Sequence, residues 1–232
     1  MTDIQPDGLN GDLTRAAEMR TNEMDWVQSP TPTVWRKRLD HIGPAEAGRV
    51  TSLVRFEPGA QFPVHDHPDG EEILVLDGVF SDHTGDWGAG SFLLNPEGFR
   101  HAPWTAQGCL LFVKLRQYGG RNRQHLALDT DAMDWQPQGA DGRRIKPLYR
   151  QAGFPEQIRL VELAAGTRVE RHPHPGGEEV FVLSGSIQDD NGVYPAGTWF
   201  RLPDGSSHAP WSEDGCTLYV RVGHLPTADR AG

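Results

Sequence analysis

Cysteine is scarce in this chain, with only Cys109 and Cys216 among 232 residues. With so few thiols, the sequence argues against a Cu(I) site or an iron–sulfur cluster, both of which select thiolate ligands. The two cysteines are 107 positions apart, and each stands in a Gly-Cys step that enters an apolar run. Equivalent positions of this kind predict two buried strand thiols rather than a disulfide.

The chain also lacks an excess of positive charge and any long apolar run. Its 22 Lys and Arg residues are outnumbered by 32 Asp and Glu residues, which gives a formal net charge of −10 and a pI near 5.4. Such an acidic chain is not expected to have nucleic acid or an anionic membrane as its main partner. No stretch is long enough to span a membrane, and the N-terminus lacks the basic-then-apolar pattern of a signal peptide. We therefore expect a cytoplasmic protein without a membrane partner.

Helical periodicity is rare, and the 18 prolines would interrupt most helices. Instead, apolar segments of four to eight residues alternate with Gly, Pro, Asp and Asn, as at Ile73-Leu74-Val75-Leu76 before Asp77-Gly78. Many short strands at even spacing predict an all-β protein made of closed β-barrels or jelly rolls. Apolar residues on both faces of segment 71–77 indicate contacts between barrels or between subunits of a homo-oligomer.

The most informative feature that is present is an internal repeat with an offset of 107 positions. It keeps three histidines and a glutamate in strict register, which indicates that the chain was built twice around one kind of site. The paired positions are Gly59/Gly166, His65/His172, His67/His174, Glu71/Glu178, Gly78/Gly185, Gly90/Gly197, Pro96/Pro203, Gly98/Gly205 and His101/His208.

The repeat divides the chain into two domains of about 100 residues each. Met24-Asp25-Trp26 is echoed by Met133-Asp134-Trp135 at an offset of 109, so the first copy has two extra residues between Leu39 and Val50. Residues 1–22 match nothing in the second half and are expected to form a flexible arm. With the Gly/Arg-rich stretch 119–124 as linker, we predict domains at 23–125 and 126–232.

The spacing of the histidines and the glutamate predicts metal binding. In a strand, side chains at i and i+2 lie on one face, so His65 and His67 both point inward. A turn at 68–70 brings Glu71 to the start of the returning strand, and His101 arrives from a second hairpin. Three imidazoles and a carboxylate suit a divalent metal, with Fe or Zn foremost and Mn, Ni and Co also compatible, one ion per domain. The predicted ligands are His65, His67, Glu71 and His101, and in the second copy His172, His174, Glu178 and His208.

The pattern Gly-x5-His-x-His-x3-Glu-x6-Gly, followed by Gly-x5-Pro-x-Gly-x2-His, resembles the two motifs of the cupin superfamily. Both copies match at the glycines, the proline and the ligand positions, which implies two tandem cupin barrels, a bicupin. The asparagine that often closes the second motif is replaced by Thr105 and Ser212; it is not a ligand in the family. Stretches such as Pro-Glu-Gly-Phe-Arg-His-Ala-Pro are similar to the cupin domain of ChrR-type anti-sigma factors, over nearly all of residues 24–225.

The resemblance leaves several functions open. Related cupins imply a mononuclear-metal dioxygenase that cleaves diketone-like or hydroxyketone-like small molecules. The ChrR likeness implies a non-catalytic module that senses a ligand or a metal, although the arm lacks the histidine and paired cysteines with which ChrR binds its sigma factor. A cupin decarboxylase or isomerase is a third reading. No separate acid–base residue stands out, so catalytic residues beyond the metal ligands stay unassigned.

Overall fold

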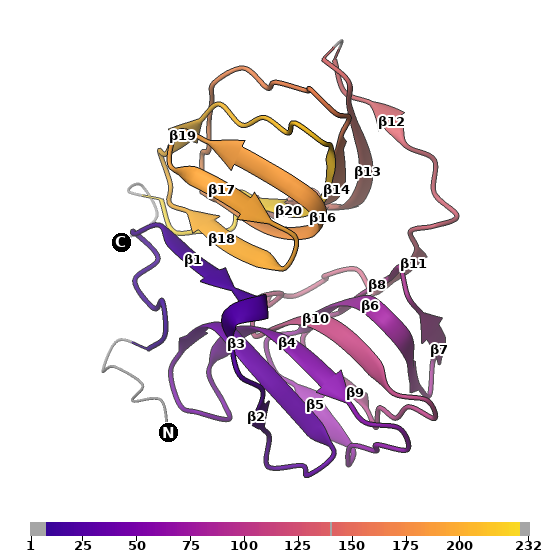
Figure 1. The fold of residues 1–232 in the computed structure, drawn as a ribbon. Coiled ribbons are helices and arrows are strands. Elements are labelled where there is room, and N and C mark those ends of the chain that lie inside the picture. Colours follow the sequence, from indigo (N-terminus) through magenta and orange to yellow (C-terminus); the bar gives the residue numbers. More distant parts are fainter. Residues whose placement is uncertain (1–7, 140, 228–232) are drawn as a thin grey trace. The chain divides into compact units, whose positions relative to one another are not determined.

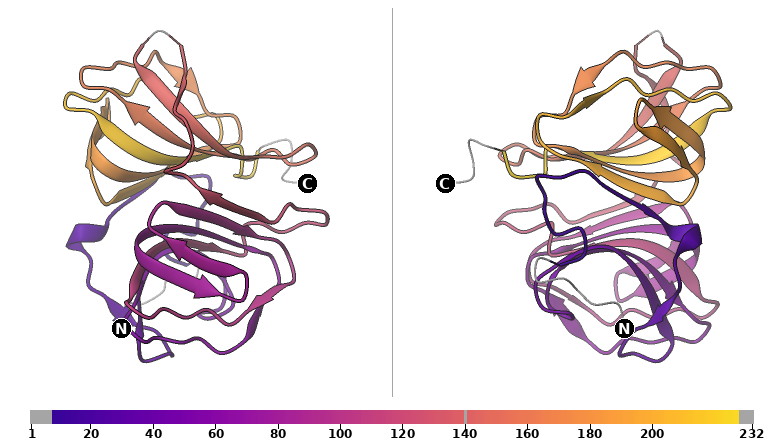
Figure 2. Two further views of the ribbon diagram at one scale, coloured as in Figure 1. Left: turned by 90° about the vertical axis from the view of Figure 1, so that its right-hand side faces the viewer. Right: turned by 60° about the vertical axis from the view of Figure 1, so that its left-hand side comes forward.

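The computed structural model describes residues 8–139 and 141–227, which form two compact units of antiparallel β-sheet. The first unit contains the described residues through Gly11 together with Met24–Ala132. The second contains Asp12–Glu23 and the described residues from Met133 onward. Figures 1 and 2 show that the strands of each unit curl into a barrel.

The first barrel is built on an eight-stranded sheet in the order β11-β8-β6-β10-β4-β3-β2, with β7 paired to β6. Strands β5 and β9 form a separate two-stranded sheet. The strands of this unit are β2 (Val27–Gln28), β3 (Val34–Ile42), β4 (Arg49–Phe56), β5 (His65–His67), β6 (Glu71–Asp82), β7 (Gly85–Gly88), β8 (Ser91–Asn95), β9 (Phe99–His101), β10 (Cys109–Leu115) and β11 (Leu126–Asp129).

The second barrel repeats this plan. Its eight-stranded sheet has the order β1-β18-β16-β20-β14-β13-β12, with β17 on β16, and β15 and β19 form the small sheet. The strands are β1 (Ala17–Arg20), β12 (Gln136–Pro137), β13 (Arg143–Arg150), β14 (Gln157–Leu163), β15 (His172–Pro173), β16 (Glu178–Asp189), β17 (Gly192–Pro195), β18 (Thr198–Leu202), β19 (Ser207–His208) and β20 (Cys216–Val222).

The described residues confirm the all-β prediction. Helical structure among them is limited to the 3-10 turn η1 (Thr21–Glu23). In the part of the chain that the structure describes, no helix is long and apolar enough to cross a membrane.

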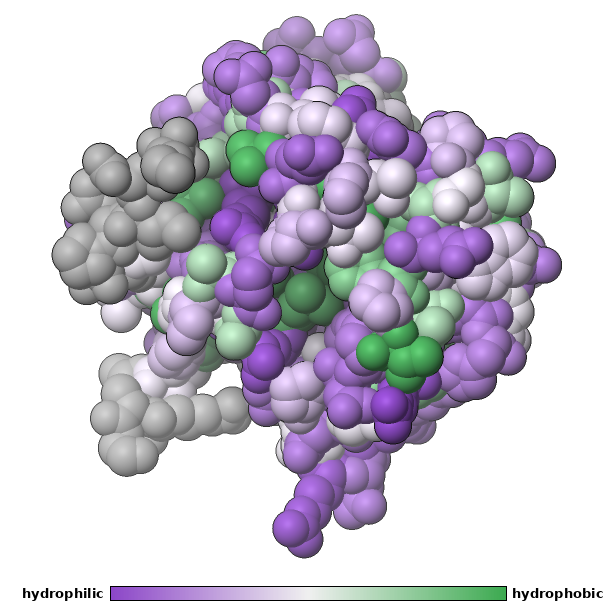
Figure 3. All heavy atoms as spheres, turned by 90° about the horizontal axis from the view of Figure 1, so that it is seen from below, coloured by the Kyte–Doolittle hydropathy of each residue, from purple (hydrophilic) through white to green (hydrophobic). Residues whose placement is uncertain are grey.

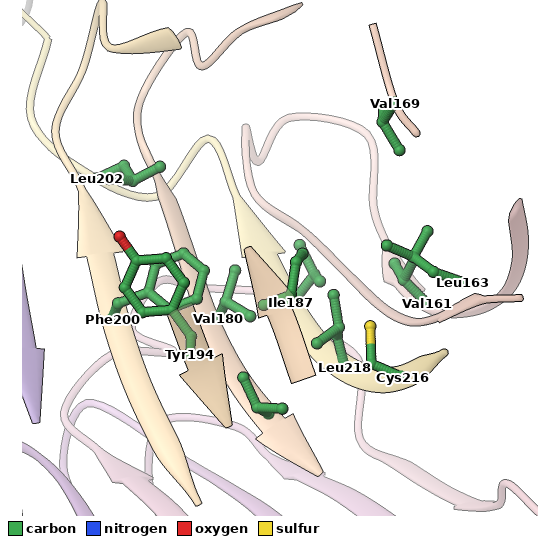
Figure 4. Packing of buried hydrophobic residues seen from close by; sticks show 12 residues of the cluster. Val161, Leu163, Val169, Val180, Ile187, Tyr194, Phe200, Leu202, Cys216 and Leu218 are labelled. Carbon is green, nitrogen blue, oxygen red and sulfur yellow. The ribbon is translucent and has the colours of Figure 1, made fainter. Parts of the chain in front are cut away.

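Each barrel encloses its own apolar core. The core of the first includes Ile73, Val75 and Phe80, all on β6 and at most 2% exposed. Figure 4 shows the core of the second, in which the rings of Tyr194 and Phe200 lie together with centroids 4.5 Å apart. Figure 3 shows a mostly hydrophilic outer face with smaller hydrophobic areas between the polar groups.

A β-bulge in the longest strand of each barrel changes which residues face inward. Opposite β10, the pairing of β6 shifts between Val75 and Asp77, so one strand has an extra residue there. Simple alternation would place Phe80 on the face opposite to Ile73 and Val75, yet all three belong to one core. The backbone at the bulge requires glycine at position 78. Its φ is +73°, and a Cβ there would lie only 2.1 Å from the carbonyl oxygen of Gly108. The second barrel has the matching shift between Val182 and Ser184.

The N-terminal segment and the domain boundary differ from the sequence prediction. Within the predicted arm, Ala17–Arg20 forms β1 and pairs in antiparallel register with β18 of the second barrel. Residues 1–7 lie outside the described residues. The sequence predicts the second domain from residue 126, whereas β11 (Leu126–Asp129) pairs with β8 of the first barrel. In both cases a short strand completes the edge of a sheet, because its own backbone N–H and C=O groups need partners.

Candidate metal centres

Strand pairing brings the predicted histidines of the first copy together. Strands β5 and β9 are antiparallel, and their register sets His65 directly opposite His101. The turn after β5 is fixed at the backbone oxygen of His67, which accepts hydrogen bonds from the N–H groups of Gly70 at 3.2 Å and Gly98 at 2.8 Å. These two glycines, of which Gly98 belongs to the second motif, therefore hold the two histidine-bearing segments against each other. Glu71 opens β6, as the sequence predicts.

The first centre consists of three imidazoles and a nearby carboxylate. Three ring nitrogens, one each from His65, His67 and His101, lie within 4.8 Å of one another. The Nε2 atoms of His67 and His101 are 2.9 Å apart. An Oε2 atom of Glu71 lies 3.4 Å from the first of these nitrogens and 3.5 Å from the second. Asn95 donates a 3.0 Å hydrogen bond to the same oxygen and so orients it.

The second centre repeats the first. Strands β15 and β19 set His172 directly opposite His208, and these two rings group with His174 within 4.8 Å. An Oε2 atom of Glu178 is 3.6 Å from Nδ1 of His174 and 3.4 Å from Nε2 of His208. The structure thus gathers all eight predicted residues into two separate groups, one in each barrel.

Hydrogen bonds to the far nitrogen fix the orientation of two rings in each centre. Nδ1 of His65 lies 2.9 Å from the carbonyl oxygen of Pro63, and Nδ1 of His101 lies 2.9 Å from Oδ2 of Asp82. Because these acceptors need a proton on Nδ1, the lone pair is left on Nε2.

The matching contacts of the second centre join Nδ1 of His172 to the carbonyl oxygen of Glu170 at 2.9 Å, and Nδ1 of His208 to Asp189 at 3.1 Å. These partners accept a hydrogen bond in the same way as those of the first centre. Both centres therefore present at least two fixed imidazole lone pairs to one point.

Sequence reasoning missed Asp82 and Asp189, although they share the 107 offset of the motif (189 − 82). Alternation counted from Glu71 places Asp82 on the outer face of β6, and only the bulge turns it inward to His101. The repeat register was the signal that could have found the pair.

The geometry of both groups fits a metal ion. Two ligand atoms about 2.1 Å from a common ion are about 3.0 Å apart at a right angle and about 3.4 Å apart at the tetrahedral angle. The separations of 2.9 to 3.6 Å among the nitrogens and carboxylate oxygens match such edges. Two imidazole nitrogens at 2.9 Å also need a proton or a cation between them.

Burial disfavours the charged form of one well-buried imidazole in each centre. Burial lowers the pKa of His67, and it lowers the pKa of His174 to about 3. Burial alone would raise the pKa of Asp82, but hydrogen bonds from His101 and Thr84 hold that pKa well below its usual value. A charged Asp82 that accepts the hydrogen bond from Nδ1 of His101 leaves the lone pair of that ring on Nε2.

The carboxyl group of Glu178 shares the desolvated interior with the rings, and this burial raises its pKa to about 7. The nearby Arg159 acts in the opposite direction. A bound metal ion would act in the same direction as Arg159 and lower the pKa of Glu178 further.

The two centres open on cavities of very different size. The first forms part of the wall of a cavity of about 510 Å³, whose lining includes His65, His67 and Glu71. The second lies beside a cavity of about 150 Å³, whose lining includes His172, Glu178 and His208. Pockets of roughly 300 to 1,000 Å³ accommodate small organic ligands, so only the first is of that size.

Solved structures with the same fold support the architecture. A protein from Nostoc punctiforme proposed to be a dioxygenase aligns with a TM-score of 0.74 and 16% identity over 94% of this chain and 86% of its own. The pirin YhhW of Escherichia coli, solved with nickel(II), aligns with a TM-score of 0.65 and 13% identity, covering 92% of this chain and 100% of its own. A variant of Bacillus subtilis oxalate decarboxylase aligns with a TM-score of 0.57 and 14% identity, covering 89% of this chain and 76% of its own. At these identities the likeness shows the fold alone.

Sequence comparison identifies the family. No curated protein sequence matches the chain significantly. The family model described as the ChrR cupin-like domain matches twice, at residues 14–119 and 123–226. These two matches take in most of the chain and both histidine groups, and the protein therefore belongs to the ChrR cupin-like family, whose domain it contains in two tandem copies.

Proposed function

We propose that this protein is a metal-dependent dioxygenase acting on a small oxygenated organic substrate of the diketone or hydroxyketone type. The observation that carries the proposal is the position of the first histidine group in the wall of a cavity of about 510 Å³. A closed structural metal site would need no such space beside it.

The side chains of the first centre perform the tasks that this chemistry needs. His65, His67, His101 and Glu71 would hold the ion, and Asp82 fixes the tautomer of His101. A divalent metal bound there supplies Lewis acidity and open positions for substrate oxygens and dioxygen. Much of the cavity wall is apolar, and a substrate that displaces water from it would strengthen the polar interactions at the centre.

The comparisons support the proposal at the level of the fold. The Nostoc punctiforme protein is itself proposed to be a dioxygenase, and the Escherichia coli pirin was solved with nickel(II). Oxalate decarboxylase shares the fold as well, so architecture by itself does not select the reaction.

The test combines metal analysis with oxygen uptake. Protein purified without added metal is expected to contain a first-row metal, of which Fe or Zn fits the donor set well. The iron-loaded protein should consume oxygen with at least one member of a panel of diketones and hydroxyketones, and His67→Ala should abolish that consumption. His83→Ala is the control, because His83 is an exposed histidine outside both groups. No oxygen consumption across the panel would contradict the proposal and favour a ligand- or metal-sensing module.

A further inference from the structure

The large cavity of the first barrel is apolar along most of its wall but carries two arginines. Arg36 and Arg38 lie two residues apart on β3, so their side chains share the inner face of that strand, and both line the cavity. Each is about three-quarters buried, with side-chain exposures of 22% and 26%. Two guanidinium groups in a desolvated wall need an anion.

A side-chain carboxylate now fills that need. Glu46 accepts hydrogen bonds from Arg36 at 2.8 Å and from Arg38 at 2.9 Å, one through each carboxylate oxygen. It belongs to the loop in which the first copy has two extra residues, and its side chain is 51% exposed. The Glu46 side chain is half exposed and pairs with the arginines from the solvent side, where ion pairs contribute little stability, so a carboxylate bound inside the desolvated cavity could displace it at small cost.

A buried hydroxyl faces the same cavity. Ser52 lies directly opposite Arg38 in the β3–β4 register and is 3% exposed. Its Oγ is buried without a hydrogen-bond partner in the described structure, and Ser52 lines the cavity. Because buried hydroxyl groups are normally hydrogen-bonded, this one has unused capacity for a polar ligand atom.

The second barrel differs at all three positions. Where the first has Arg36 and Arg38, the strand register places Ile145 and Pro147. Opposite Pro147, at the position of Ser52, stands Arg159, which lines the small cavity and interacts electrostatically with Glu178. Arg143 lines the same small cavity, so the second barrel has cationic side chains as well, but its cavity of about 150 Å³ is too small for an organic ligand.

We propose that the first barrel, and not the second, binds an organic carboxylate whose anionic end pairs with Arg36 and Arg38 in place of Glu46. The apolar body of this ligand lies along the cavity toward the first histidine group. That the ligand is the substrate rests on the proposed function; that the site binds such an anion does not. The substrate class then narrows to oxygenated molecules that also carry a carboxylate.

Calorimetric titration with octanoate and with the uncharged 1-octanol tests the site on the intact metal-containing protein. Octanoate should bind at least about tenfold more tightly than octanol, since a hydrogen-bonded ion pair contributes more than 1.4 kcal/mol. The double variant Arg36→Gln/Arg38→Gln should lose this preference and keep its affinity for octanol. Arg55→Gln is the matched control, because Arg55 lies on the same sheet over the Trp26 and Trp35 rings and outside the cavity lining. Glu46→Gln should tighten octanoate binding several-fold.

A reciprocal exchange tests the choice of barrel. Ser52→Arg should weaken both ligands at least about tenfold by filling the cavity, whereas Arg159→Ser should leave octanoate binding to the first barrel unchanged. Metal content should equal that of the wild type in the arginine, glutamate and serine variants. Equal binding of octanoate and octanol would overturn the proposal. So would a preference for octanoate that survives Arg36→Gln/Arg38→Gln but is lost in His65→Ala/His67→Ala, and so would a preference that survives the arginine substitutions alone. Octanoate preference without oxygen consumption on any substrate would defeat only the proposed enzyme activity.

Discussion

At the residue scale, the aspartates behind the metal-site histidines give the sharpest test of the centres. Asp82 lies 2.9 Å from Nδ1 of His101, and both side chains are almost fully buried. Asp82→Asn should weaken metal binding by the first centre about 10- to 100-fold, because the amide no longer fixes the tautomer or raises the basicity of the ring. Competition with a chelator measures the change. Asp86→Asn, in the exposed part of the next strand, is the control, and equal affinities in the two variants would contradict the assigned role.

The sequence was sufficient to predict which residues converge in each centre, but not their aspartate partners. Side-chain alternation and the turn at residues 68–70 predict the convergence of His65, His67 and Glu71, and the structure brings these residues together. Asp82 lies 11 residues after Glu71, on a strand whose parity changes at a bulge. A bulge depends on contacts of the glycine backbone with a neighbouring strand, and local sequence does not reveal those contacts.

The two cysteines lead to a prediction about reactivity. Cys109 and Cys216 are free and buried, as the sequence predicts. Burial raises the pKa of Cys109 to about 12 and also raises that of Cys216. At pH 8 both thiols are therefore almost entirely protonated, and the thiolate is the reactive form. The folded protein should therefore not react with Ellman's reagent at pH 8, while two thiols should react after denaturation. Rapid reaction of the native protein would show that these strands open.

At the scale of elements, β1 is the strand that the sequence did not reveal. Residues 17–20 correspond to β11 at 126–129 by the 109 offset of Met24 and Met133, yet the only identity near them is Thr21 with Thr130. Those two threonines make equivalent hydrogen bonds. The hydroxyl of Thr21 donates to the carbonyl oxygen of Gly197, and that of Thr130 donates to the carbonyl oxygen of Gly90. A four-residue edge strand has too few side chains to produce a recognisable pattern, and its partner is distant in sequence.

A pair of prolines tests the pairing of β1. Along antiparallel strands, hydrogen-bonded residue pairs alternate with pairs that are not hydrogen-bonded. The N–H of Thr21 donates to the carbonyl oxygen of Gly197. Two residues earlier on β1, Met19 therefore also forms a hydrogen-bonded pair with its partner Trp199. Met19→Pro removes this bond and should lower the free energy of unfolding by about 1 to 3 kcal/mol.

Two variants isolate the backbone effect in urea denaturation. Glu18→Pro should cost much less, because the N–H of Glu18 points away from β18 at the sheet edge. Met19→Ala separates the loss of the side chain from the loss of the hydrogen bond. Equal destabilisation by the two proline variants would mean that β1 does not pair as described.

At the scale of the whole molecule, the repeat predicts two barrels and two centres but not the difference between them. The motif positions are the same in both copies, so pattern alone implies two equivalent sites. The difference comes from Arg36, Arg38 and Ser52 against Ile145, Pro147 and Arg159, none of which belongs to the motif. Cavity volume is set by how such side chains pack in three dimensions, which a sequence pattern does not contain.

Metal removal provides the test at this scale. An ion bound only by the folded state stabilises the protein by RT ln(1 + [L]/Kd), about 2.7 kcal/mol when the free ion is at 100 times its Kd. Each barrel has its own histidine group, so the wild type should bind up to two ions, His67→Ala or His174→Ala one, and the double variant none. Elemental analysis after dialysis gives these counts.

The thermal midpoint provides a second measurement. For each protein we compare the midpoint before and after addition of a chelator, and the size of this shift should follow the number of bound ions. This comparison cancels the intrinsic effect of removing a buried imidazole, which differs between His67 and His174 because their surroundings differ. The wild type should lose the most on chelation, each single variant less, and the double variant nothing. His83→Ala should behave as the wild type. A double variant that still retains two ions, or whose midpoint falls on chelation as far as that of the wild type, would show that these histidines are not the ligands.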